Sequence, residues 1–155
     1  MLSLSRRFSL SLLACGLATG LMALPVQAQA QEFVSVKGDS AKVREQPSTK
    51  ADVLWELGEG YPLQVTQRKN GWLQVKDFET SLGWIYAPRT SKKPHMVITA
   101  KVANLRAGPT QKDKVLAKLE AQEIVQTVKK SGDWVQIKRS NGQQGWIASQ
   151  LAWGW

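Results

Sequence analysis

Apolar and polar residues alternate over short runs through most of the chain after residue 31. In the run "WLQVK" (72–76), Leu73 and Val75 share one face of an extended segment, and Trp72 lies on the other. Gly, Pro, Asn and Asp bound these runs, which is typical of short β-strands joined by turns. The pattern therefore predicts an all-β fold.

The alternating pattern occurs twice along the chain. Residues 41–87 align without a gap over residues 103–149, and 14 of the 47 positions are identical. A repeated unit of this kind is a structural unit, and two copies are too few for a solenoid. We therefore expect two small domains in tandem, residues 32–89 and 96–155, joined by a proline-containing linker over residues 90–95.

One segment of the second copy also fits a helix. Residues 112–130 place apolar side chains at roughly helical spacing. The same positions of the first copy contain Gly58, Gly60 and Pro62, and a proline inside a helix costs about 3 kcal/mol. Because two ungapped copies share a fold, we predict strand, turn and strand in both.

The register of the later strand in this segment stays open. Ile124 and Val128 compete with Val125 for the inner face. Further along, Asn141 and Gly142 predict a tight hairpin turn, since both residue types adopt positive φ readily.

The second copy carries the motifs of a known family. Its segments "ANLRAGPT", "GDWVQIK" and "NGQQGWI" resemble a bacterial Src homology 3 (SH3-like) domain. The first copy is similar, but Lys42 and Val43 replace the Asn-Leu pair and Gln46 replaces the glycine. The resemblance implies two small antiparallel β-barrels, each of about five to seven strands. It covers residues 33–152 and implies a general-purpose binding module.

The physics of the opening motif agrees with a strand that runs into a turn. Leu105 faces the core, while Asn104 and Arg106 face outward. We expect Gly108 to take a positive φ where the strand leaves the sheet, and Pro109 to fix the loop. The first copy, with Gln46 at that position, has to make the turn differently.

The first 30 residues have the three-part pattern of a secretory signal peptide. A double arginine (6–7) precedes an uncharged apolar run (8–24), and small residues mark cleavage after Ala28 or Ala30. The run is short for a membrane anchor. A lipoprotein signal at Cys15 is the less favoured alternative, because the residues that follow it stay apolar. No later stretch is apolar enough to span a bilayer, so the mature chain is predicted to be periplasmic or secreted.

The chain offers little for catalysis. Without the signal peptide it has no cysteine, and its single histidine, His95, falls in the predicted linker, where we expect it to be solvated. This argues against a Cys-His peptidase and a histidine metal site. Acidic residues show no metal-binding spacing, although two distant carboxylates could still meet. We predict a protein that is not an enzyme and that has no cofactor or metal.

The aromatic residues divide into shared and unshared positions. Positions present in both copies are expected to serve the barrels. These residues are Trp72, Trp84, Trp134 and Trp146, and we assign a structural role to Gly108 and Pro109 of the opening motif as well. Unshared aromatics and the polar residues of the opening motif are the candidates for ligand binding: Trp55, Tyr61, Tyr86, Asn104, Arg106 and Trp155.

The two copies differ in charge. Residues 32–89 contain eight basic and eight acidic residues, whereas residues 90–155 contain eleven basic and four acidic ones, a net charge of +7. A solvated basic face and a polyanion-binding face both fit this excess. The expected basic surface comprises Lys112, Lys114, Lys118, Lys129, Lys130, Lys138 and Arg139.

These features predict an exported, non-catalytic module that binds cell-wall peptidoglycan or its stem peptides. The alternative is an adaptor that docks another protein of the cell envelope. Anionic surface polymers are a further expected partner, whereas an export signal argues against nucleic acid.

Overall fold

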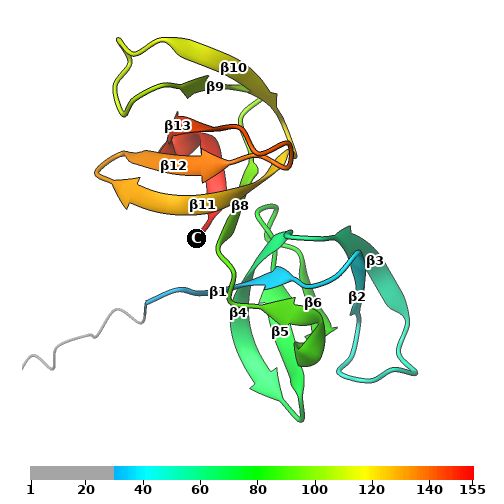
Figure 1. The fold of residues 1–155 in the computed structure, drawn as a ribbon. Coiled ribbons are helices and arrows are strands. Elements are labelled where there is room, and N and C mark those ends of the chain that lie inside the picture. The colour runs from blue at the N-terminus through cyan, green and yellow to red at the C-terminus, as the bar shows by residue number, and fades with distance from the viewer. Residues whose placement is uncertain (1–29) are drawn as a thin grey trace, which may run out of the picture.

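The computed structural model describes residues 30–155 as two units, each a seven-stranded antiparallel sheet (Figure 1). The predicted signal peptide (1–30) lies outside the described residues except for its last position. The all-β prediction is confirmed.

The first unit forms one curved sheet in the order β3-β2-β6-β5-β4-β1-β7. A short 3₁₀ turn, Ala87–Arg89, precedes its last strand. The strands are β1 (Glu32–Val36), β2 (Ser40–Arg44), β3 (Val53–Gly58), β4 (Pro62–Lys69), β5 (Trp72–Lys76), β6 (Leu82–Tyr86) and β7 (Thr90–Ser91).

The second unit repeats this order strand for strand, β10-β9-β13-β12-β11-β8-β14. A 3₁₀ turn, Ser149–Leu151, again precedes the last strand. The strands are β8 (His95–Ile98), β9 (Val102–Arg106), β10 (Val115–Glu120), β11 (Ile124–Ser131), β12 (Trp134–Lys138), β13 (Gln144–Ala148) and β14 (Ala152–Gly154). Strand, turn and strand thus replace the helical alternative in both copies.

The segment between the units is shorter than the predicted linker. Thr90–Ser91 pairs with β1 and belongs to the first sheet, while His95 begins the first strand of the second. Residues 92–94 alone connect the two sheets.

Each unit has its own apolar core, so each satisfies the alternating pattern independently. Leu73 and Val75 point inward as predicted. The first core contains Val34, Val36, Ala41, Val43, Leu63, Leu73, Val75 and Ile85. The second contains Met96, Ile98, Ala103, Leu105, Leu119, Val125, Val135, Ile137 and Ile147.

A β-bulge resolves the register of β11. Val125 is 1% exposed, whereas Val128 is 46% exposed. The pairing of β11 with β12 shifts between Thr127 and Lys129, so Val128 is the extra residue and the alternation breaks there. The first unit has the same shift between Val65 and Gln67 of β4. The bulge explains why the apolar pattern alone left the inner face undecided.

The hairpin turn between β12 and β13 differs from the prediction. Gly142 has φ +86°, but Asn141 is not among the residues with positive φ. Asn141 acts through its side chain instead, since its Oδ1 accepts a 3.0 Å hydrogen bond from the backbone N–H of Gln143. Asparagine thus serves the turn as a local acceptor.

The prediction of a positive φ at Gly108 is wrong. Gly108 is needed for space: a Cβ there would lie 2.6 Å from Oδ2 of Asp113, which accepts a hydrogen bond from the Thr110 hydroxyl. The first copy has Gln46 at the glycine position and Ala51 at the aspartate position. The two copies therefore differ by a paired exchange, in which the larger side chain moves from one position to the other.

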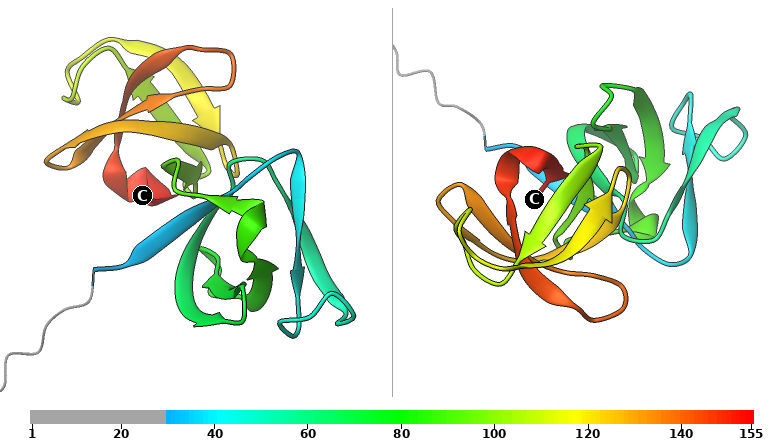
Figure 2. Two further views of the ribbon diagram at one scale, coloured as in Figure 1. Left: turned by 60° about the horizontal axis from the view of Figure 1, so that its bottom comes forward. Right: turned by 90° about the horizontal axis from the view of Figure 1, so that it is seen from above.

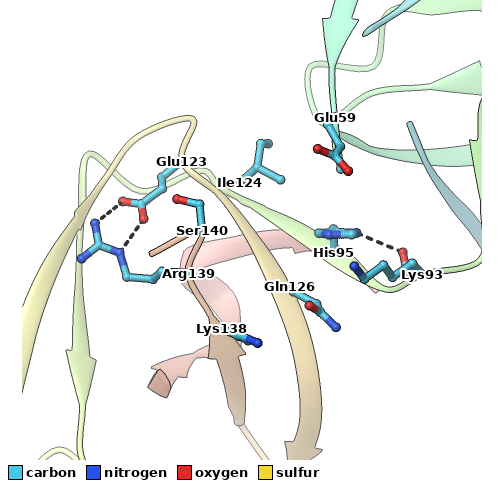
Figure 3. Close-up of a pocket in the computed structure, with 10 residues that line it drawn as sticks. Glu59, Lys93, His95, Glu123, Ile124, Gln126, Lys138, Arg139 and Ser140 are labelled. Atoms are coloured by element: carbon cyan, nitrogen blue, oxygen red, sulfur yellow. Dashed lines mark hydrogen bonds and ion pairs between the residues drawn. The ribbon is translucent and has the colours of Figure 1, made fainter. Parts of the chain in front are cut away.

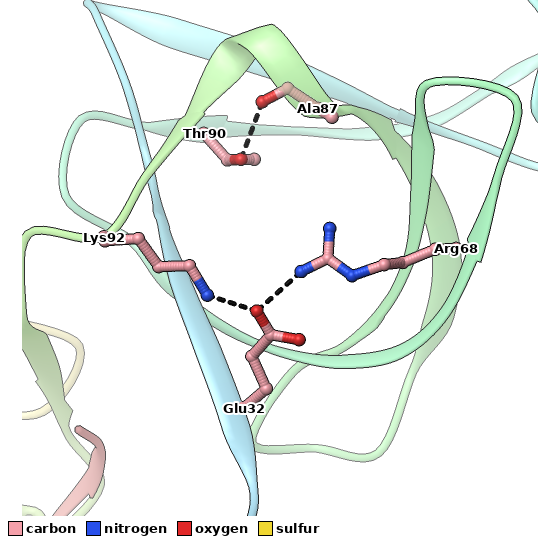
Figure 4. Close-up of polar contacts among 5 residues, drawn as sticks. All are labelled: Glu32, Arg68, Ala87, Thr90 and Lys92. Carbon is pink, nitrogen blue, oxygen red and sulfur yellow. Dashed lines mark hydrogen bonds and ion pairs between the residues drawn. The ribbon is translucent and has the colours of Figure 1, made fainter.

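Glu32, at the start of β1, forms a cluster of ion pairs with residues of β4 and of the segment after β7. Its carboxylate pairs with Arg68 of β4 at 2.5 Å and with Lys92, which follows β7 (Figure 4). The hydrogen bond from Lys92 is the main cause that lowers the pKa of Glu32. Thr90 donates a 2.7 Å hydrogen bond to the carbonyl oxygen of Ala87 beside this cluster.

The C-terminal segment packs on the first unit. Both views in Figure 2 show the end of the chain beside β1. The ring of Trp153 meets Phe33 edge-on at a centroid distance of 5.1 Å, and Trp155 lies 6.4 Å from the same ring. Trp155 is thus part of the contact between the units, which favours a packing role for it over the predicted ligand contact.

A turn of the first unit also meets the second unit closely. Gly60 has φ +77°, and Gln122 adopts φ +68° at the matched turn of the second copy. The turn itself therefore accepts a side chain. A Cβ on Gly60, however, would lie 3.1 Å from Cδ2 of His95 and 3.2 Å from Cγ2 of Ile124. Glycine at position 60 leaves room for the second unit.

Candidate binding sites

The predicted aromatics of the first unit separate into inner and outer groups. Trp55 and Tyr61 pack against the first core. Burial is the main cause that raises the pKa of Tyr61 to about 12, and the indole Nε1 of Trp55 is buried without a hydrogen-bond partner in the described part of the chain. This packing favours a structural role for both residues over the predicted ligand contact.

Arg106 holds its own loop. Its Nη1 donates a 2.9 Å hydrogen bond to the carbonyl oxygen of Asp113, and Arg44 makes the matched bond to Ala51 at 2.6 Å in the first unit. An arginine with the same bond in both copies stabilises the loop that follows β2 or β9. Asn104 lies partly buried on β9, opposite Lys118 of β10.

An outer groove of the first unit contains Tyr86 and Trp72. The two rings lie 5.4 Å apart, and the groove between β2, β5 and β6 has a volume of about 300 Å³. Tyr86 is 45% exposed, whereas Trp72 is 8% exposed. Lys42, Arg44 and Glu56 line the same groove, so charges of both signs surround the rings. An aromatic floor with a charged rim suits a ligand that has apolar and polar parts.

The second unit has a groove that partly overlaps the matched place and shares three lining positions with the first groove, those of Thr49, Trp72 and Tyr86. Trp134 occupies the position of Trp72, and Ala148 replaces Tyr86. This groove has a volume of about 400 Å³. Trp72 and Trp134 lie outside both apolar cores, on the faces opposite Leu73 and Val135. The duplicated tryptophans, predicted to be structural, therefore line the outer grooves.

Of the other duplicated pair, Trp84 is buried in β6 of the first unit at 8% exposure, whereas Trp146 in β13 of the second unit lies beside part of the basic surface. The ammonium group of Lys129 lies 5.4 Å from the ring centroid of Trp146. Arg139 was predicted to belong to the exposed basic surface. It instead donates hydrogen bonds to Glu123 through Nε at 2.7 Å and through Nη2 at 3.3 Å. Five further predicted bases are exposed: Lys112, Lys114, Lys118, Lys130 and Lys138.

A pocket of about 550 Å³ lies between the units (Figure 3). The first unit contributes Glu59 and Gly60. The connecting segment and the second unit contribute Lys93, His95, Gln126 and Lys138, with the Glu123–Arg139 pair at one side. The repeat gives no direct signal for this pocket, because Lys93 and His95 lie outside the aligned residues 41–87 and 103–149.

His95 is part of this pocket and is not a solvated linker residue. Its ring is half-buried against the first unit, and its Nδ1 lies 3.1 Å from the carbonyl oxygen of Lys93. Burial is the main cause that lowers its pKa below the ordinary value, and this effect exceeds the opposing effect of the hydrogen bond to the Lys93 carbonyl oxygen. The imidazole is therefore neutral at pH 7.

A metal site or a membrane-spanning helix in residues 30–155 would change the functional interpretation. Within that range no group of three or more His, Cys, Asp or Glu side chains is placed to hold a metal ion. Over the same residues, no helix has the length and hydropathy to cross a bilayer.

Two small antiparallel sheets with one strand order define a tandem SH3-like protein. The family comparison agrees: the bacterial SH3 domain model matches residues 37–92 and 99–154. The chain belongs to the bacterial SH3 domain family, which confirms the resemblance of the motifs.

Relatives place such domains in larger proteins. Over 74 residues the chain is 31% identical to "Putative N-acetylmuramoyl-L-alanine amidase YrvJ" of Bacillus subtilis (strain 168), covering 48% of this chain and 14% of that protein. Solved structures named NlpC2 and NlpC1 from Trichomonas vaginalis show 15% and 16% identity, each with a TM-score of 0.38. The match covers 81% of this chain in both cases, and 48% and 46% of those chains. TM-scores this low establish no common arrangement.

Proposed function

We propose that the protein is an exported, non-catalytic module that binds cell-wall peptidoglycan through its stem peptides. The observation that carries the proposal is the pair of bacterial SH3 units, each with an outer groove lined by the duplicated tryptophan, Trp72 or Trp134. The matched relative is named as an N-acetylmuramoyl-L-alanine amidase, and the bond in that name joins the glycan to the stem peptide. This name supports the same choice of polymer.

The groove of the first unit has the chemistry that such a ligand requires. Tyr86 and Trp72 offer ring surface to the apolar parts of a peptide, while Lys42 and Arg44 offer charge to its carboxylates. The basic second unit adds attraction to a wall that is rich in carboxylates.

Co-sedimentation with purified, protein-free sacculi tests the proposal. We expect the protein to pellet with sacculi. Replacement of Tyr86 by alanine removes ring surface from the first groove and weakens pelleting, by about 1–3 kcal/mol if the ring stacks on the ligand. Leu82→Ala is the matched control, because Leu82 is 52% exposed on the same strand as Tyr86.

The second groove allows the opposite test. Ala148→Tyr places a ring beside Trp134, as Tyr86 lies beside Trp72, and we expect stronger pelleting. Runs at low and high salt separate charge from ring contacts, because salt screens exposed charges. Absence of pelleting under every condition contradicts the wall hypothesis and favours the adaptor alternative.

A further inference from the structure

The pocket between the units has an unequal distribution of charge. Lys93 and Lys138 line it with ammonium groups that form no ion pair among the described residues. Arg139 is neutralised by Glu123, which leaves Glu59 as the one opposing charge on the wall of the first unit. The pocket therefore carries a small positive excess and has space for one anionic group.

The remaining lining fits a peptide better than a simple ion. Figure 3 shows Lys93, Gln126 and Lys138 around one part of the pocket, with Glu59 above His95. Gln126 offers an amide that both donates and accepts, and Ile124 offers an apolar contact for a small side chain. A volume of about 550 Å³ falls in the range of small-molecule sites, roughly 300–1,000 Å³.

We propose that this pocket binds the free carboxylate end of a short peptide. Lys93 and Lys138 donate hydrogen bonds to the carboxylate, and Gln126 bonds the preceding peptide group. Glu59 repels a second negative charge, which makes the pocket a poor site for phosphate polymers. The proposal deepens the proposed function and rests on it for the source of the peptide.

The pocket is lined by residues of both units, so its shape depends on the contact between them. Gly60 keeps the first unit against His95 and Ile124, and Phe33 packs on the C-terminal tryptophans. Neither unit alone supplies both the bases and the opposing acid. The binding groups come from the connecting segment and the second unit, whereas selectivity against a second negative charge requires the first unit to be packed as described.

A titration of the protein with two soluble probes, followed through backbone amide chemical shifts, tests the proposal. Diacetyl-Lys-D-Ala-D-Ala has a free carboxylate, and its C-terminal amide is the matched uncharged probe. We expect shifts at Gly60, Gln126 and Ser140 with the acid, and binding weaker by about tenfold with the amide. Equal binding of acid and amide, or shifts confined to the Trp72 groove, overturns the proposal.

Charge variants give a second measurement with opposite signs. Lys93→Gln and Lys138→Gln each weaken binding of the acid probe by about tenfold. Glu59→Gln removes a repulsion between exposed charges and tightens binding by about twofold to fivefold. All three side chains are exposed, so the fold tolerates the exchange. Unchanged affinity in both lysine variants also overturns the proposal.

Parallel pelleting assays separate this proposal from the proposed function. Binding of the acid probe without pelleting on sacculi supports the pocket and refutes the wall as the source of the peptide, which leaves the C-terminus of a protein partner. Pelleting without acid-probe binding refutes the pocket and leaves the proposed function standing.

Discussion

Replacement of Gly60 by glutamine tests whether the two units pack against each other as described. Gln122 provides the internal reference, because the second copy has glutamine in the same turn at φ +68°. The backbone of position 60 therefore accepts glutamine at the ordinary cost of left-handed geometry, about 1–2 kcal/mol. The neighbour differs between the copies, since the new Cβ would lie 3.1–3.2 Å from His95 and Ile124.

The magnitude follows from these distances. Carbon atoms pack best at about 3.5–4.0 Å, so the second unit has to move by several tenths of an ångström or more. Overpacking of this kind costs typically about 1–3 kcal/mol. Together with the backbone cost, Gly60→Gln is expected to lower the free energy of unfolding by about 2–5 kcal/mol.

Calorimetry and amide chemical shifts measure this effect. We expect a lower melting temperature and shifted amides in β8 (His95–Ile98), where the second unit meets the turn. Gln122→Gly is the matched control, because it relaxes the same turn without a partner from the other unit. Its stability is expected to change by less than about 1 kcal/mol. If Gly60→Gln has native stability and native β8 shifts, the units do not pack at this turn.

Three further predictions concern single sites. Gly108→Ala brings a Cβ against the Asp113 carboxylate and lowers stability by about 1–2 kcal/mol, while adding Asp113→Ala restores most of the loss; equal loss in the single and double variants refutes the paired exchange. Burial raises the pKa of Tyr61 to about 12, so the protein loses stability as pH rises from 10 toward 12, and Tyr61→Phe removes that part of the pH dependence in thermal unfolding. Burial is the main cause that lowers the pKa of His95, and the Lys93 ammonium group lowers it as well, whereas the hydrogen bond to the Lys93 carbonyl and the nearby Glu59 raise it. Because the net shift is downward, protonation of His95 costs stability as pH falls below 6.5. A His95→Gln variant with an unchanged loss of stability between pH 6.5 and 5 contradicts that assignment.

The alternation of apolar residues predicted the strands well, because each unit buries its own core. It predicted that Leu73 and Val75 share the inner face with Trp72 on the opposite face, and the structure agrees, with Trp72 buried there at 8% exposure. It left β11 undecided because the bulge at Val128 interrupts the period that the prediction needs.

The candidate site was harder to predict, because duplication of a residue does not show whether both copies use it in the core or on an outer face. Trp72 and Trp134 are shared because both units keep an outer groove, whereas the unshared Trp55 and Tyr61 fill gaps beside the first core. The unmatched glycine at position 60 was the one available signal of a neighbouring unit.

The alternation of apolar residues could predict neither the pocket between the units nor the packing of the C-terminus. The terminal strand β14 is three residues long and pairs with β8, too short to show a period. Phe33 and Trp153 meet across 120 positions, and nothing in either local sequence records that contact.

Binding to two forms of peptidoglycan tests the central claim most directly. Intact sacculi carry stem peptides, whereas glycan strands freed of peptides by amidase digestion do not. We predict that the protein binds intact sacculi and loses most of that binding on the peptide-free strands. Equal binding to both forms, or binding to neither, contradicts the account.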